Sequence, residues 1–198
     1  FCRGVNENQL KTTQLKLAAK CGINKSTSGV MARAEKSVLS SVWDVNEYWA
    51  DSETSGLEIS VIKRDLEEIV SEGFKRDGQI SIDDIYSHLE VEYGFAPCNL
   101  SAFIVGFLLK EYGGEPFRYL DSSGSHDSMS AEKLSEMIGN YISGKSQPTY
   151  IVKMTPEEMA FYEVTEKAWG LESDSCAHIS QAQVGVKNKM QSLRLPVW

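Results

Sequence analysis

One ten-residue segment, Leu100 to Leu109, constrains this chain more than any other, because only Ser101 and Gly106 interrupt its apolar run. The segment is far shorter than the ~18 apolar residues of a transmembrane helix, so it has the length of a buried helix. A helix that is apolar on all sides must be surrounded by other elements. We therefore predict a central helix over about residues 99–112, ended by the glycine pair that follows it. The chain has 198 residues, enough for one large domain or two small ones.

Apolar residues at helical spacing predict roughly seven more helices around this centre. Three of them begin with a capping residue, Ser81, Ser130 or Thr155. The sequence Thr-Pro-Glu-Glu from Thr155 combines a cap, a first-turn proline and a capping-box glutamate. Gly73 is expected to end one helix. The predicted helices cover residues 10–21, 30–42, 59–73, 82–93, 130–141, 155–169 and 177–193.

Two short segments, residues 117–120 and 149–154, predict strands that pair at one edge of the fold. A Ser-rich turn or small wing at 121–128 and a helix lie between them. The predicted fold class is mainly α, a helical domain with a small two-stranded β element that is compatible with a winged-helix variant. Because the polar stretch 48–56 also marks a change in charge sign, we predict three parts. These are a basic N-terminal helical hairpin at 1–50, a winged-helix-like helical domain at 57–155, and C-terminal helices at 156–198 that pack on it.

Charge is unevenly distributed along the chain. The net charge of −8 argues against nucleic-acid binding by the chain as a whole. Residues 1–40 hold seven Lys or Arg against two Glu, a net +5, which leaves −13 for the remaining residues. DNA contact is therefore expected only near the N-terminus, and the acidic remainder favours contacts with protein.

The segment from Leu17 to Thr27 resembles a helix-turn-helix, with an Ala-rich first helix, a glycine at the turn and a Ser-Thr start to a second helix. In this interpretation Asn24, Lys25, Ser26 and Thr27 face a major groove or its phosphates, and Lys20 and Arg33 add positive charge. Any hairpin of two helices also prefers Gly at its turn and Ser or Thr at its cap. A purely structural interpretation therefore stays open.

Residues 139–146 match the phosphate-loop pattern GxxxxGK[ST] letter for letter, with Gly144, Lys145 and Ser146 as the nucleotide-binding residues. A phosphate loop needs a strand before it and a helix after it, so that the N-terminal amides of the helix face the phosphates. Here a capped helix is predicted before the loop, and Pro148 and a strand after it. We therefore favour a helix that ends at glycine and continues into a polar loop.

No catalytic residue, metal site or cofactor is predicted elsewhere. The cysteines lack metal-ligand spacing and are expected to be small buried side chains in a reducing compartment. His88 is expected to point outward, and no nucleophile with a partnered base can be argued. Paired carboxylates lie at helix starts or flanks, where they cap or are solvated. The four cysteines are Cys2, Cys21, Cys98 and Cys176.

Four stretches carry a family resemblance: Val-Glu-Tyr-Gly-Phe-Ala-Pro (91–97), Leu-Ser-Ala-Phe-Ile-Val-Gly-Phe-Leu-Leu-Lys (100–110), Tyr-Leu-Asp (119–121) and Tyr-Ile-Val-Lys-Met-Thr-Pro-Glu-Glu (150–158). They resemble helical, winged-helix-like segments downstream of the ATPase module in very large bacterial P-loop NTPases. Some of those NTPases belong to phage-defence (bacteriophage-exclusion) systems. The resemblance covers residues 57–198 and implies a non-catalytic module beside an ATPase whose phosphate loop lies upstream. It transfers no functional residue, because the matching positions look structural.

We therefore expect a cytoplasmic, non-catalytic accessory module of a larger bacterial NTPase, with DNA contact through the basic N-terminal segment as one role. The expected partners are the remainder of its parent chain and DNA, without a membrane. Two alternatives stay open: a protein–protein scaffold that binds no nucleic acid, and a nucleotide hydrolase that uses Lys145 and Ser146. The apolar residues at both ends, Phe1 and Trp198, favour a segment cut from a longer protein.

Overall fold

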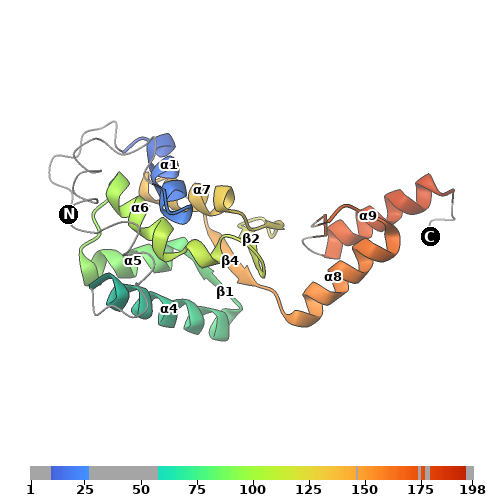
Figure 1. The fold of residues 1–198 in the computed structure, drawn as a ribbon, viewed down its shortest axis with the longest axis horizontal. Helices are drawn as coiled ribbons and strands as arrows, with labels where there is room; N and C mark the ends of the chain where they lie inside the picture. The colour runs from blue at the N-terminus through green and yellow to red at the C-terminus, as the bar shows by residue number, and fades with distance from the viewer. Residues whose placement is uncertain (1–9, 27–57, 146, 174, 177–178, 195–198) are drawn as a thin grey trace.

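The computed structural model describes residues 10–26, 58–145, 147–173, 175–176 and 179–194. Within these residues the fold is mainly α, as predicted (Figure 1). The predicted helix over 30–42 lies outside the described residues, and the other predicted helices are present. The elements are α1 (Thr12–Ile23), α4 (Glu58–Asp77), β1 (Gln79–Ser81), α5 (Ile82–Tyr93), α6 (Asn99–Leu108), the 3-10 helix η1 (Lys110–Tyr112), β2 (Phe117–Asp121), β3 (His126–Ser128), α7 (Ala131–Ile142), β4 (Thr149–Lys153), α8 (Pro156–Trp169) and α9 (Ile179–Ser192).

The four strands form one antiparallel sheet in the order β1-β4-β2-β3. Ile151 of β4 is fully buried and lies between Ile80 of β1 and Tyr119 of β2. The predicted pairing of residues 117–120 with 149–154 is confirmed, but the prediction of a two-stranded element is wrong. β1 and β3 have three residues each, too few to show the alternation that identifies a strand in a sequence.

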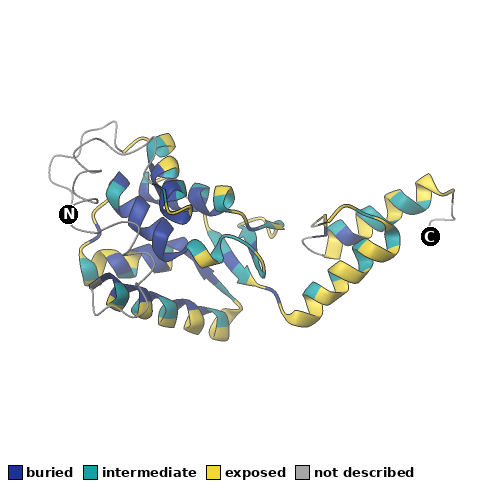
Figure 2. Ribbon diagram, viewed as in Figure 1, coloured by how far each residue is buried: buried dark blue, intermediate teal, exposed yellow. Residues whose placement is uncertain are grey.

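Helix α6 is the centre of the fold, as its apolar composition predicts. All of its residues except Leu100 are buried, and α1 and α7 pack against it (Figure 2). At the crossing of α1 and α6 the two backbones touch. A Cβ atom at Gly22 would lie 2.0 Å from the Phe103 carbonyl oxygen, and one at Gly106 would lie 2.2 Å from that of Ala19. Because α1 belongs to this core, the predicted separation of residues 1–50 as a unit of their own does not hold for α1.

Helix α4 passes through Gly73, where we predicted its end, and continues to Asp77. Gly73 is buried, and a Cβ atom there would lie 2.6 Å from Cδ1 of Ile80. Glycine at this position therefore lets β1 lie close to α4. Gly78, with a φ of 70°, follows the helix in the left-handed conformation that ends many helices.

The cysteines differ in part from the prediction. Cys21 and Cys176 are buried and are not disulfide-bonded, as expected. Cys98 is disulfide-bonded, so the expectation of unpaired thiols is wrong for this residue. Cys98 is also the N-cap of α6, where its Sγ accepts a hydrogen bond from the Ser101 N–H at 3.4 Å.

Helices α8 and α9 form a hairpin that extends away from the other described elements, which we call the body (Figure 1). The hairpin itself is called the arm below. No residue of α8 is buried, and Ala182 is the only buried residue of α9 in the described part of the chain. The prediction that the C-terminal helices pack on the preceding domain is therefore wrong. The capping box of Thr155 and Glu158 is confirmed and starts the arm.

Candidate interaction surfaces

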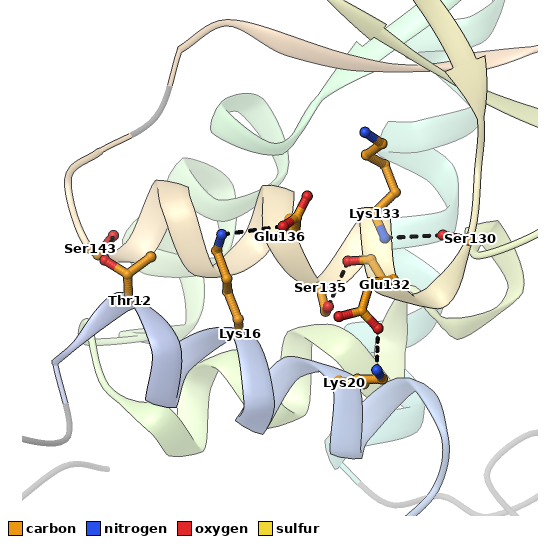
Figure 3. A network of polar contacts seen from close by, with 9 residues as sticks. All are labelled: Thr12, Lys16, Lys20, Ser130, Glu132, Lys133, Ser135, Glu136 and Ser143. Atoms are coloured by element: carbon orange, nitrogen blue, oxygen red, sulfur yellow. Dashed lines mark hydrogen bonds and ion pairs between the residues drawn. The ribbon is translucent and has the colours of Figure 1, made fainter.

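A row of polar side chains joins α1 to α7, which run antiparallel (Figure 3). Lys20, one of the predicted DNA-binding residues, forms an ion pair with Glu132, so its charge already has a partner within the fold. The two helices pack closely at Gly139, where a Cβ atom would lie 2.7 Å from the Lys16 amide nitrogen. This close approach brings the polar side chains of the two helices into contact. The other contacts are Thr12 Oγ1 to Ser143 Oγ at 3.1 Å and Lys16 Nζ to Glu136 Oε1 at 3.5 Å.

The remaining predicted DNA-binding residues in the described region terminate α1. The Asn24 N–H donates to the Lys20 carbonyl oxygen at 3.0 Å, and the Ser26 N–H donates to that of Cys21 at 2.8 Å. Lys25 is exposed and has a φ of 52°. Thr27, Arg33 and the expected second helix lie outside the described residues. The structure therefore brings Lys20 and residues 24–26 to one end of α1, and leaves the groove-facing role a prediction.

Gly144 and Lys145, from the phosphate-loop match, close the C-terminal end of α7. Gly144 has a φ of 69°, and its N–H donates to the Tyr141 carbonyl oxygen at 2.9 Å. The Lys145 N–H donates to the Asn140 carbonyl oxygen at 2.9 Å, which completes a Schellman motif. These amides are therefore used by the helix, and the negative end of its dipole disfavours an anion. Ser146 lies outside the described residues, and β4 follows where a phosphate loop needs a helix.

Lys145 also lines a polar hollow of about 230 Å³ between α7 and the sheet. Lys133 lines it too, but its Nζ lies 3.2 Å from the Asp127 carboxylate and 4.6 Å from the centre of the Tyr119 ring. Asp121 and Glu136 balance the two lysines, so the lining carries no net charge. Such a lining has no excess positive charge with which to hold a phosphate group.

A carboxylate, an imidazole and a phenol meet where α4 packs on α5. His88 Nε2 lies 2.6 Å from Asp65 Oδ2, and the Tyr93 hydroxyl donates to the same oxygen at 2.9 Å. The expectation that His88 points away from the fold is therefore wrong. The hydrogen bond with His88 lowers the pKa of the Asp65 carboxyl against the opposing effect of burial, and Tyr93 adds to the lowering. The described residues contain no group of three or more metal-binding side chains.

We predict that Asp65→Asn destabilises the protein at pH 7 and less so in acid. A carboxyl whose folded pKa lies below its unfolded value stabilises the fold above about pH 3.9 and loses this contribution as pH falls through the folded pKa. Because Asp65 is about one-third exposed, solvent limits the effect to about 1 kcal/mol or less. Urea unfolding of the parent protein and the variant at pH 7 and pH 3 measures the difference in their free energies of unfolding.

Asp83→Asn is the control, because burial, followed by the nearby Asp84 charge, raises the pKa of Asp83. Folding disfavours the ionised form of Asp83, so we expect Asp83→Asn to raise the free energy of unfolding at pH 7. Equal destabilisation by Asp65→Asn at both pH values would contradict a role for the ionised carboxylate.

The arm carries apolar side chains on its exposed surface. Phe161, Val164 and Ala168 follow one another at intervals of three and four residues, and so form one stripe along α8. Phe161 is 50% and Val164 is 64% exposed. At 3.6 residues per turn this stripe lies opposite the less exposed face of Met159, Tyr162 and Trp169. Both faces of α8 can be followed in the sequence, but only the exposure of Phe161 and Val164 in the fold identifies one of them as a site.

No helix in the described part of the chain is both long and apolar enough to cross a membrane.

The chain was compared with protein-family models, curated proteins and solved structures. None of them is significantly similar to it.

Proposed function

We propose that this chain is a non-catalytic protein–protein interaction module and that the arm is its docking element. The observation that carries the proposal is the exposed stripe of Phe161, Val164 and Ala168, on a hairpin that buries almost nothing of its own. Each helix of the arm has 14 residues, a length that is marginal in water without tertiary packing. A protein surface that covers the stripe supplies this packing, as exposed apolar patches commonly indicate.

The connectivity of the body supports a winged-helix-like description while arguing against DNA recognition by its central helix. The body contains, in chain order, α4, β1, α5, α6 and β2. In this order α6 occupies the position that a recognition helix has in a winged-helix domain. A recognition helix needs an exposed polar face to reach base edges. Helix α6 is apolar and buried, and α1 and α7 cover it. DNA contact, the other predicted role, is left to Lys25 and its neighbours at the end of α1.

We further propose that the module belongs to a larger bacterial NTPase of the phage-defence type that residues 57–198 resemble, and that it lies beside the ATPase. Hydrolysis by this chain has less support, since the amides of Gly144 and Lys145 cap α7. We place the module in the cytoplasm with such an ATPase. The absence of a disulfide at Cys21 and Cys176 fits this placement, and the disulfide at Cys98 argues against it.

The test is photo-crosslinking in cells that produce the protein, with a benzophenone amino acid in place of Phe161. We expect ultraviolet light to give protein adducts, which mass spectrometry then identifies. The same amino acid in place of Ser122, an exposed residue in the turn after β2, is the control and should give few adducts. An absence of adducts at position 161 would contradict the proposal. Salt-sensitive binding of duplex DNA that Lys25→Ala abolishes would instead support the DNA-contacting role.

A further inference from the structure

A groove lined by aromatic side chains lies on the body, between α4, η1 and the sheet. Phe74, Tyr112 and Phe117 line a hollow of about 460 Å³ and are each partly exposed. Their rings pack together, with 5.9 Å between the centres of Phe74 and Phe117 and 5.0 Å between those of Tyr112 and Phe117. Aromatic side chains of this kind are enriched where proteins bind one another, because they offer a large rigid contact area.

The charges at the rim of the groove are mainly positive. Glu67 lies at the rim, but its carboxylate is 3.6 Å from Lys63 Nζ and is neutralised there. Lys75 and Lys153 are exposed and form no ion pair with any other described residue. The groove therefore suits an apolar segment that carries carboxylates.

Helix α8 has the complementary pattern. It contains four glutamates and one lysine, a net −3. Glu157 precedes Phe161 by four residues and therefore lies on the same stripe, next to the apolar side chains. The stripe thus offers one aromatic, two small apolar side chains and a carboxylate to a surface that has aromatics and two lysines without an ion-pair partner among the described residues.

Local contacts at the end of β4 direct the arm away from the groove of its own chain. Lys153 lines the groove and ends β4, and the next residues direct the chain away. The Met154 N–H donates to the Pro116 carbonyl oxygen at 3.0 Å, and Met154 is buried. Thr155 then starts α8 through its capping box, with Pro156 in the first turn. These contacts hold the arm in the extended position seen in Figure 1, so the groove is accessible to another molecule.

We propose that α8 of one copy docks in the aromatic groove of a second copy, and that the second copy returns the contact, which gives a two-fold symmetric dimer. Phe161 and Val164 enter the groove, and Glu157 lies near Lys75. A reciprocal exchange of this kind closes on itself and buries both stripes and both grooves. The proposal rests on the arm being a protein-docking element, and it adds the identity of the partner and of the receiving surface.

Sedimentation velocity of the purified chain from about 1 to 100 µM tests the proposal. We expect a dimer that Phe161→Glu converts to a monomer over the whole range, with unchanged circular dichroism of the body. Val91→Glu is the matched control, because Val91 is 78% exposed on α5 and lines neither surface, so this variant should dimerise normally. A monomeric parent protein, or a Phe161→Glu variant that still dimerises, would overturn the proposal.

A charge-exchange experiment identifies the groove. We expect Glu157→Lys and Lys75→Glu each to weaken dimerisation about tenfold, because each places like charges together at two equivalent contacts. An equimolar mixture of the two variants forms a heterodimer in which both contacts are again attractive, so dimerisation is restored. A mixture that stays monomeric would exclude this groove as the docking site of α8. A third outcome is a chain that is monomeric in sedimentation but forms crosslinks from position 161 to a different protein. In that case the arm is a docking element, and the second copy is not its partner.

Discussion

Gly106→Ala should lower the free energy of unfolding by about 3 kcal/mol, although the same change in most helices is favourable by about 1 kcal/mol. The reversal follows from the contact between α1 and α6. The new Cβ atom would lie 2.2 Å from the Ala19 carbonyl oxygen, a backbone atom that cannot move away without separating the two helices. Urea unfolding followed by circular dichroism measures the difference.

Gly114→Ala is the matched control for this prediction. No atom lies within 4 Å of a Cβ atom at Gly114, and its φ is not positive, so the change should alter stability by about 0.5 kcal/mol or less. Equal stability of the Gly106→Ala variant and the parent protein would mean that α1 does not lie against α6 at this distance.

Leu15→Ala should destabilise the whole body by about 3 kcal/mol, because Leu15 is fully buried and its truncation leaves a cavity among α1, α6 and α7. Leu17→Ala, two residues away on the same helix, should cost less than about 1 kcal/mol, because Leu17 is 41% exposed. Denaturant unfolding compares the two, and hydrogen exchange reports where protection is lost. We expect Leu15→Ala to reduce protection in α6 and α7 as well as in α1.

This second prediction separates two views of the N-terminal segment. If α1 formed an independent hairpin, Leu15→Ala would reduce protection in α1 alone and leave α6 and α7 unchanged. The packing of α1 against α6 and α7 instead predicts that these three helices unfold together. The functional consequence is that the positive charges of α1 at Lys16 and Lys20 serve to hold α7 and are not all available to a nucleic acid.

The position of most helices follows from local patterns. The caps at Ser81, Ser130 and Thr155 were predicted, and in each the side chain accepts a hydrogen bond from the backbone three residues later. These signals act within one turn of helix, so the sequence of that turn is sufficient to define them. The central place of α6 follows in the same way, because a helix without a polar face must be surrounded.

The candidate sites depended much less on local pattern. The phosphate-loop letters at Gly144 and Lys145 match completely, yet the same residues are well suited to end a helix, and only the neighbouring elements distinguish the two uses. Gly73 has the same ambiguity, since glycine both ends helices and permits close packing. The aromatic groove brings together Phe74, Tyr112 and Phe117 from three elements, and no spacing in the sequence predicts that meeting.

The amino-acid sequence alone was therefore enough to place the helices, their caps and the buried centre, since each depends on residues a few positions apart. The partners of these elements depend on the folded chain. Lys16 and Glu136 are 120 positions apart, and their contact exists because Gly139 lets α1 lie against α7. The exposure of the arm has a similar origin, because the fixed exit of β4 at Met154 directs α8 away from the body. Long-range packing of this kind is a property of the whole fold, and that is why neither the groove nor the arm stripe could be recognised as a site before the tertiary structure was known.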